Sequence, residues 1–271
     1  MAVQVSSAIT LTTDFGQRDP WVAVMKGVLA SLAPGATLLD LSHSIAPQGI
    51  LEGAFFLASA IPHFPVGTVH LVVIDPGVGT DRRPIVAELA GQHVVCPDNG
   101  LLTLLEKTHK IERIHEITNP AYGLPKPSAT FHGRDIFAPA AAHVALGKDL
   151  ASFGPAMETL RKIPIPEAST DAENQLHGEV IHVDHFGNCI TNISEKMLGS
   201  HRDYRVQVAA QTLGPIQRTY ADVTPGTALA LFGSTGHLEI AASMSNAARN
   251  LQLHTGSPVT LYRPAKTRRK K

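Results

Sequence analysis

Four aspartates end predicted secondary-structure elements, each beside a glycine or a tight turn. They are Asp14 in TTDFG, Asp75 in IDPGVG, Asp98 in PDNG and Asp184 in VDHFGN. Aspartate often initiates turns, so each residue taken alone favours a turn role. The first three together would lie at the carboxyl edge of one sheet, where a row of carboxylates suits the binding of vicinal hydroxyls such as those of a ribose.

Arginine and histidine side chains accompany this edge. Arg82 and Arg83 follow Asp75 in the stretch VHLVVIDPGVGTDRR, within reach of the same crevice. His132, in FHGRD, follows a proline-rich loop and immediately precedes a predicted helix, so it would face a crevice. These residue types predict an Asp/Arg/His-rich site that binds a nucleoside.

No common cofactor motif accompanies this site. The sequence contains no phosphate loop, no GxGxxG fingerprint and no GxSxG elbow. His182 and Asp184 could share one strand face, but no third metal ligand is nearby. We therefore expect neither a metal nor another cofactor.

The elements that must position these residues alternate along the first part of the chain. The apolar run at 69–74 is typical of a strand buried on both faces of a parallel sheet. Further strands are predicted at 8–13, 37–41, 84–89, 93–97 and 111–117, with helices after Trp21, after Pro47, at 101–107 and at 136–146. This alternation predicts an α/β N-terminal domain with a largely parallel central sheet.

The composition changes after Lys162. Residues 163–175 are proline-rich and polar, which is typical of a linker. Short apolar segments follow at 179–183, 205–208, 228–232 and 258–262, and they predict an all-β C-terminal barrel or sandwich, of which we favour the barrel. The expected organisation is an α/β nucleoside-binding catalytic domain (1–162), the linker (163–175), a β-barrel domain (176–265) and a basic tail (266–271).

The overall composition excludes several function classes. With 44% hydrophobic and 17% charged residues and a formal net charge of zero, the 271-residue chain has no global field that would attract nucleic acid or a membrane surface. The basic run Lys266–Lys271 is interpreted as a solvated tail. Two distant cysteines and the absence of a signal-peptide pattern favour a soluble, cytoplasmic protein.

Five motifs carry a resemblance to a known family. In this order, TTDFG, DPGVGT, PDNG, FHGRD and HFGN resemble the S-adenosyl-L-methionine hydroxide adenosyltransferases, the hydrolase branch of the superfamily that includes the fluorinases and chlorinases. The resemblance implies an N-terminal α/β domain, a C-terminal β-barrel and a homotrimer, with each active site between one subunit's N-terminal domain and its neighbour's C-terminal domain. It also implies hydrolysis of S-adenosyl-L-methionine to adenosine and L-methionine, by attack of water on the ribose 5′ carbon.

The same resemblance implies residue roles. Asp75, Arg82 and His132 match the triad that activates water, and which of the three is the base stays open. Asp14 matches the aspartate that holds the ribose hydroxyls. The remaining matches lie in the second half of the chain: Asp184 for the methionine ammonium, Phe186 and Asn188 for the adenine, Ser234 and Glu239 on the methionine-binding strand, and Met244, whose backbone would meet the adenine.

Two alternative functions follow from the same residues. Gly133, where fluorinases place a halide-binding serine, also resembles the chlorinase pattern, which implies a halide-dependent transferase that forms 5′-chloro-5′-deoxyadenosine. Against this, Asp75 replaces the fluorinase tyrosine, and a carboxylate beside the nucleophile pocket repels an anion and accepts a proton from water. The other alternative is a nucleoside-binding sensor without turnover.

Overall fold

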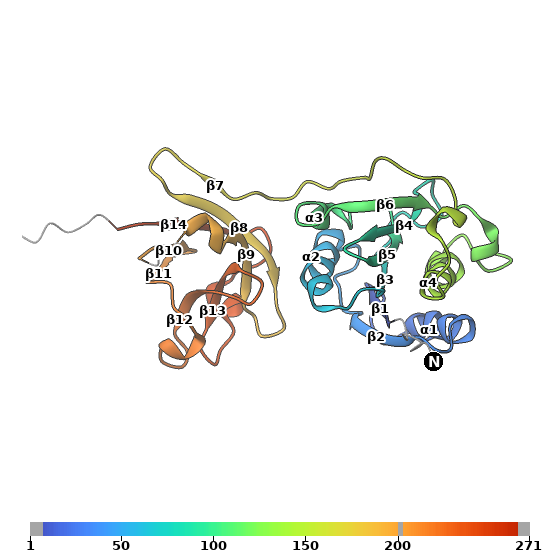
Figure 1. Ribbon diagram of the computed structural model, residues 1–271. Coiled ribbons are helices and arrows are strands. Elements are labelled where there is room, and N and C mark those ends of the chain that lie inside the picture. The colour runs from blue at the N-terminus through green and yellow to red at the C-terminus, as the bar shows by residue number, and fades with distance from the viewer. Residues whose placement is uncertain (1–7, 200–202, 265–271) are drawn as a thin grey trace, which may run out of the picture. The chain divides into compact units, whose positions relative to one another are not determined.

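The computed structural model describes residues 8–199 and 203–264, which divide into two compact units between Ile165 and Pro166 (Figure 1). The predicted basic tail at 266–271 lies outside the described residues. Within the predicted linker at 163–175 the structure has a two-residue strand, β7 (Ser169–Thr170), which pairs with the second unit's sheet. In the described part of the chain, no helix is long and apolar enough to cross a membrane.

The first unit is built on a six-stranded sheet with the order β2-β1-β3-β5-β4-β6. The strands are β1 (Ala8–Thr13), β2 (Thr37–Ser42), β3 (Val69–Val73), β4 (Pro84–Leu89), β5 (Gln92–Pro97) and β6 (Ile111–Glu116). Strand β3 is buried at all five positions, as its uninterrupted apolar run predicts. The pairs β1–β2, β1–β3 and β3–β5 are parallel.

Strand β4 runs against its neighbours, so the sheet is mixed and the predicted parallel arrangement holds only in part. Leu89 pairs with Gln92, which closes a hairpin of two residues between β4 and β5. The two turn residues, Ala90 and Gly91, have φ values of 49° and 69°. Positive φ at both positions is the signature of a type I′ turn, whose twist matches that of paired strands.

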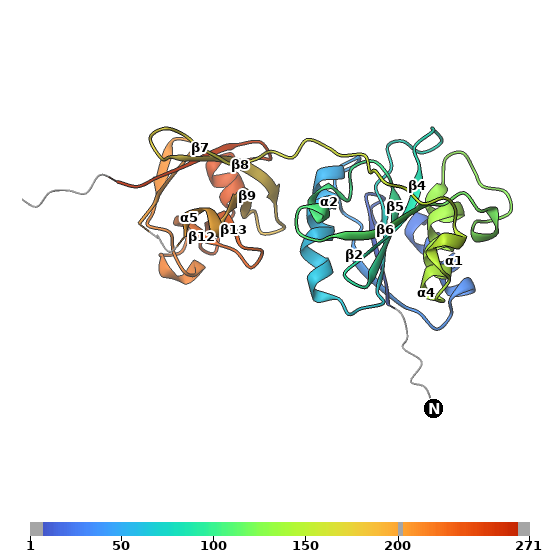
Figure 2. The ribbon, with the colours of Figure 1, turned by 45° about the horizontal axis from the view of Figure 1, so that its top comes forward.

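Helices cover both faces of this sheet (Figure 2). Helices α1 (Trp21–Leu32) and α4 (Ala138–Ala145) pack on one face, where Leu11, Met25 and Phe137 belong to the same buried cluster. Helices α2 (Ile50–Ala60) and α3 (Thr103–Glu106) cover the other face. Short 3-10 turns lie at Ile61–His63, Pro120–Tyr122 and Leu150–Ser152. The predicted helix at 136–146 begins earlier, as a π-helical turn at Gly133–Phe137.

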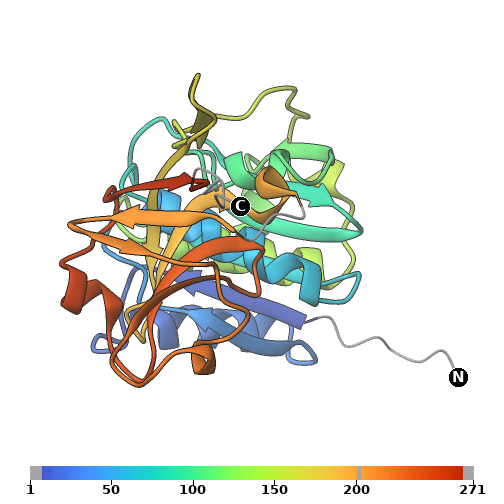
Figure 3. The same ribbon diagram turned by 90° about the vertical axis from the view of Figure 1, so that its left-hand side faces the viewer.

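The second unit is an antiparallel, barrel-like sheet with the order β11-β10-β14-β8-β9-β13-β12 (Figure 3). Its strands are β8 (Leu176–Val183), β9 (Cys189–Ser194), β10 (Arg205–Val208), β11 (Gln211–Leu213), β12 (Ala228–Phe232), β13 (His237–Ala242) and β14 (Pro258–Tyr262). Three short helices accompany them: α5 (Glu195–Leu198), the 3-10 turn Tyr220–Asp222 and α6 (Ala247–Leu251). A separate apolar core fills this unit, so each unit buries its own interior.

Candidate active site

The first three sequence-predicted aspartates lie at one edge of the first sheet. Strands β1, β3 and β5 are parallel, so their carboxyl ends at Thr13, Val73 and Pro97 meet on the same side. Asp14 and Asp98 directly follow β1 and β5, and Asp75 follows β3 by two residues. This is the edge at which open α/β sheets bind ligands.

Asp75 and Arg82 form a buried ion pair at this edge. Arg82 donates from Nε to both carboxylate oxygens at 2.9 Å and from Nη2 to Oδ2 at 2.5 Å. Both side chains are only 5% exposed. The guanidinium also lies over the Phe137 ring, with Cζ 5.0 Å from its centroid. Three donated contacts and an aromatic face fix the arginine in one orientation.

His132 completes the predicted triad through Arg82. Arg82 Nη2 lies 2.7 Å from His132 Nδ1. A guanidinium nitrogen can only donate, so Nδ1 accepts this bond and the proton of the neutral ring is on Nε2. Partial burial, helped by the positive charge of Arg82, lowers the pKa of His132 below its ordinary value. The structure thus keeps His132 neutral and holds it by one ring nitrogen.

Gly133, which directly follows His132, is closely surrounded by other side chains. A Cβ atom at this position would lie 3.2 Å from Met25 Sδ, 3.3 Å from Phe131 Cε2 and 3.4 Å from Val73 Cγ1. These distances are at the tight end of ordinary packing, so any larger residue would push against its neighbours. Phe131 in turn packs edge-on against the exposed Trp21, with centroids 5.5 Å apart.

Asp14 lies at the same edge of the sheet, and one of its carboxylate oxygens accepts a hydrogen bond. Its Oδ2 accepts a 2.8 Å bond from the backbone N–H of Gln48. Within the described residues, the structure gives Oδ1 no protein partner. Asp14 is half-buried, so this oxygen is available to a hydroxyl ligand.

Asp98 is committed to the scaffold, and the predicted row of three hydroxyl-binding carboxylates is therefore wrong at this residue. Its Oδ2 accepts bonds of 3.0 and 2.5 Å from Arg83, and its Oδ1 accepts one of 2.8 Å from the backbone N–H of Arg161. Its side chain is 1% exposed. Asp98 and Arg83 thus hold the chain near Thr159 and Arg161, late in the first unit.

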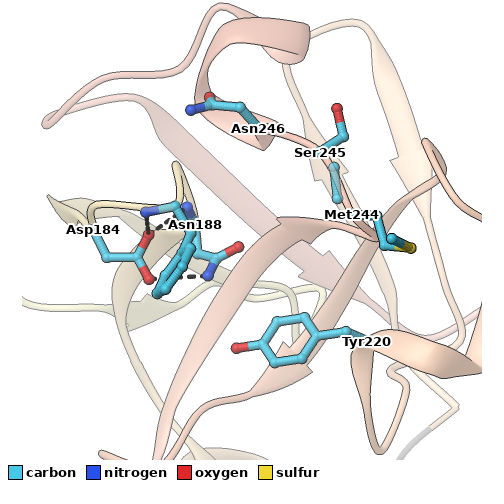
Figure 4. Close-up of a pocket in the computed structure, with 8 residues that line it drawn as sticks. Asp184, Asn188, Tyr220, Met244, Ser245 and Asn246 are labelled. Carbon is cyan, nitrogen blue, oxygen red and sulfur yellow. Dashed lines mark hydrogen bonds between the residues drawn. The ribbon is translucent and has the colours of Figure 1, made fainter.

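A pocket of about 660 Å³ opens in the second unit, and four sequence-predicted residues line it (Figure 4). They are Asp184, Phe186, Asn188 and Met244. Phe186 is 72% exposed and Met244 is 90% exposed, although both side chains are apolar. Large apolar groups exposed beside a pocket mark a binding surface.

Asp184 organises the loop that carries this pocket. Its Oδ1 accepts bonds from the backbone N–H of Phe186 at 2.9 Å and of Asn188 at 2.8 Å, and its Oδ2 accepts from Asn188 Nδ2 at 2.9 Å. The Asn188 side chain is thereby oriented, and its Oδ1 and second N–H stay available for an amide-like edge such as that of adenine. Asp184 therefore positions Asn188, whatever else it binds.

Two predicted residues of the second unit hold other positions. Ser234 lies in the exposed turn between β12 and β13. Glu239, on β13, is 6% exposed and accepts a 2.6 Å bond from the Tyr220 hydroxyl. Burial and the nearby Asp184 charge raise the pKa of Glu239, while the Tyr220 bond opposes that rise.

Sequence reasoning missed the other residues that line the pocket: Tyr220, Ala242, Ser245 and Asn246. Asn246 follows the predicted Met244 closely and caps α6 through its side chain, so proximity alone could have suggested it. Tyr220 begins a 3-10 turn far from the other pocket residues in sequence, and no motif marks it. Among the described residues, no group of three His, Cys, Asp or Glu side chains could hold a metal ion.

Comparison with known proteins gives a consistent family. The models of the SAM hydroxide adenosyltransferase N-terminal and C-terminal domains match residues 9–154 and 178–260. A protein named (R)-S-adenosyl-L-methionine hydrolase from Thermus thermophilus is 41% identical over 261 residues, which cover 92% of this chain and 97% of that protein. A fluorinase from Actinoplanes sp. is 28% identical and covers 93% of this chain and 96% of its own. A crystal structure of an uncharacterized conserved protein from Thermotoga maritima superposes with a TM-score of 0.88 at 35% identity, covering 94% of this chain and all of that one.

Proposed function

The chain belongs to the SAM hydroxide adenosyltransferase family, and we propose that it hydrolyses S-adenosyl-L-methionine to adenosine and L-methionine. The observation that carries the proposal is the bonded set Asp75–Arg82–His132 at the ligand-binding edge of the sheet. The hydrolase relative shares more identity with this chain than the fluorinase does, which favours water over halide as the nucleophile.

The reaction is a displacement at the ribose 5′ carbon. A water oxygen forms the new C5′–O bond while the C5′–S bond breaks and its electron pair stays on sulfur. The sulfonium thus leaves as the neutral thioether of methionine, which needs no general acid. The water gives up one proton, to a protein base during attack, and keeps the other as the 5′-hydroxyl hydrogen of adenosine.

Asp75 is the proton acceptor in this scheme. Arg82 stays protonated in almost any environment and already donates to both neighbours, so it cannot be the base. In the tautomer set by Arg82, His132 carries its proton on the free nitrogen and cannot accept another there. The carboxylate of Asp75 retains lone pairs beyond those that Arg82 uses, and it orients the water for in-line attack.

The remaining residues bind the substrate. Asp14 holds the ribose hydroxyls through its open oxygen, and Asn188 reads the adenine edge beside the exposed Phe186. Tyr220 joins this pocket wall, and Glu239 fixes Tyr220. Asp184 takes the methionine ammonium in addition to its loop bonds. No metal takes part in this mechanism.

The test is product analysis. Protein treated with EDTA is incubated with S-adenosyl-L-methionine, and the products are separated by chromatography. The expected products are adenosine and methionine in equal amounts, and the two sulfonium epimers are assayed separately because the relative's name specifies the (R) form. In high chloride, 5′-chloro-5′-deoxyadenosine would indicate halide transfer. Release of intact substrate in a single turnover would indicate a sensor.

The assembly is a homotrimer whose sites combine one subunit's Asp75 half with the neighbour's Asn188 half, and this part of the proposal rests on the family resemblance. Two inactive variants test it: Asp75→Ala spoils one half-site and Asn188→Ala the other. Mixed oligomers should regain activity, because some sites then draw both intact halves from different chains. If mixed oligomers form without regained activity, each site lies within one chain and the shared-site proposal fails.

A further inference from the structure

The turn that carries Asp14 is held by a histidine from the next strand. His43 follows β2 directly and is 2% exposed. Its carbonyl accepts a 2.8 Å bond from the backbone N–H of Gly16. His43 therefore contacts the chain two residues beyond Asp14, and its side chain contacts the residue just before it.

That second contact is a buried side-chain bond. Thr13 Oγ1 lies 2.9 Å from His43 Nδ1, and it also accepts a 3.3 Å bond from the backbone N–H of Phe15. On the far side of the ring, His43 Nε2 lies 2.9 Å from Asp40 Oδ1, off the line of a straight hydrogen bond. A carboxylate can only accept, so Nε2 carries the proton and Nδ1 accepts from the Thr13 hydroxyl.

The positive charge of Lys26 ends this series of contacts. Lys26, on α1, donates a 2.6 Å bond to Asp40 Oδ2. Partial burial raises the pKa of Asp40, but the Lys26 and His43 contacts outweigh it, and the pKa lies below its usual value. A deprotonated Asp40 keeps the His43 tautomer that accepts from Thr13.

We propose that His43 is a positioning residue for ligand recognition: through Thr13 on one side and Gly16 on the other, it holds Asp14 in the orientation that meets the ribose hydroxyls. The turn from Thr13 to Gly16 is bonded at both ends to one imidazole-bearing residue, and Asp14 lies between the two bonds. The carboxylate itself is clamped at Oδ2 by Gln48. Rotation of the turn would move Oδ1 of Asp14 away from a hydroxyl ligand. The bonds to His43 oppose this rotation.

The same strand offers a matched control. Thr10 Oγ1 lies 2.8 Å from Nδ1 of His70, another buried histidine, whose Nε2 lies 2.7 Å from Gln92 Oε1. This threonine–histidine pair has the chemistry of the Thr13 pair but sits in the body of the sheet, three residues before Thr13. A purely structural role for His43 predicts that breaking either pair has the same kind of effect.

The experiment compares two ligands across four variants of the full-length protein. Thr13→Val and Thr10→Val each remove one hydroxyl and keep a β-branched shape, and Asp14→Ala is the reference. His43→Asn is the second variant at the proposed device, because its amide oxygen can still accept from Thr13. Binding of adenosine and of 2′,3′-dideoxyadenosine is measured by calorimetry, and folding is checked by thermal unfolding.

Thr13→Val should weaken adenosine binding about fivefold to tenfold, the value of one oriented hydrogen bond, and leave dideoxyadenosine binding unchanged. Thr10→Val should change neither affinity, and His43→Asn should lie between wild type and Thr13→Val. The inference rests on the ribose role proposed for Asp14. If Asp14→Ala does not discriminate the two ligands, that role and this inference both fail. If Asp14→Ala discriminates and Thr13→Val weakens both ligands equally or neither, only this inference is overturned.

Discussion

Asp75 and Asp98 lie at the ends of neighbouring parallel strands, and each is bound by one of two consecutive arginines, yet the two arginines have different third partners. Arg82 continues from Asp75 to His132 Nδ1 at 2.7 Å, whereas Arg83 continues from Asp98 to the backbone carbonyl of Thr159 at 3.1 Å. The two pairs therefore differ in the third partner. The Asp75–Arg82 pair contacts an imidazole ring that can titrate, and the Asp98–Arg83 pair contacts a peptide carbonyl that cannot.

Exposure reinforces the difference. The Arg82 side chain is 5% exposed and that of Arg83 is 34% exposed. Charge pairs in a low-dielectric setting interact strongly and are costly to break, while a partly exposed pair is screened by water. The same two residue types can therefore form the proposed reaction centre or a structural clamp, and the residue types alone do not distinguish them.

The largest expected effect is at Asp75. Asp75→Asn removes the proposed base and keeps the shape, so kcat should fall by about 10²–10⁴-fold, the range typical of a lost general base. Steady-state hydrolysis of S-adenosyl-L-methionine measures it, and adenosine affinity shows whether the pocket is intact.

Asp98→Asn is the matched control. It should keep kcat within about threefold and lower the free energy of unfolding by about 1–3 kcal/mol, since one hydrogen bond of the clamp is weakened. Full activity of Asp75→Asn would remove it from the mechanism.

A second contrast uses two glycines, Gly133 directly after His132 and Gly100 two residues after Asp98. Gly133→Ala places a methyl group 3.2 Å from Met25 Sδ, and the resulting shift should move His132 off Arg82 and reduce kcat about tenfold. Adding Met25→Ala should restore kcat, although that cavity lowers stability by about 2–4 kcal/mol. Gly100→Ala would meet Ile163 Cγ2 at 2.5 Å with φ at +108°, and should lower stability without changing kcat per folded molecule. Equal kcat losses in both variants would erase the contrast.

How far the sequence predicts this arrangement depends on the range of the interactions involved. Alternating strands and helices place Asp14, Asp75 and Asp98 at one edge, because parallel strands end on the same side. The commitment of Asp98 to Arg83 and Arg161 depends on where the chain at 159–163 packs, which no local pattern encodes. Asp75 and Asp98 therefore look alike in sequence and differ only in tertiary partners.

The other misses have similar physical causes. The reversed strand β4 had only a weak local signal, since Gly91 suits the positive φ of a two-residue hairpin loop but Ala90 does not. Tyr220 had none, because its place in the pocket depends on the bond to Glu239, nineteen residues away. The motif residues Asp184, Phe186 and Asn188 are close in sequence and form one loop, so their convergence was predictable.

Protonation of His132 should also be visible in the pH dependence of kcat. The pKa of His132 is lowered by burial and by Arg82, so the ring protonates only below its ordinary value of 6.5. Protonation puts a hydrogen on Nδ1 and breaks the bond from Arg82, so kcat should fall severalfold on an acid limb centred below pH 6.5. His132→Gln should lack this limb.

The free energy of unfolding, like kcat, should fall when His132 is protonated. Between the lowered native pKa of His132 and 6.5, the unfolded chain binds more protons at this site than the folded chain does. Unfolding free energy of the wild type, relative to His132→Gln, should therefore rise with pH across that window and be constant above it. Urea titrations at several pH values measure the difference, and a difference that falls with rising pH would contradict the neutral, Arg82-bound ring.

The smallest effect is expected at Arg83, and it tests the clamp directly. Arg83→Gln removes the cation from a pair whose arginine is partly exposed, so screening limits the loss to about 1 kcal/mol. Asp98 keeps its bond from the backbone N–H of Arg161, and the backbone N–H of Ile163 keeps its bond to Thr103, so the chain at 159–163 stays attached. Thermal unfolding should show a lower midpoint with kcat and the acid limb unchanged. If Arg83→Gln instead shifts the acid limb, the two arginines share one electrostatic site, and the separation of reaction centre from clamp would be wrong.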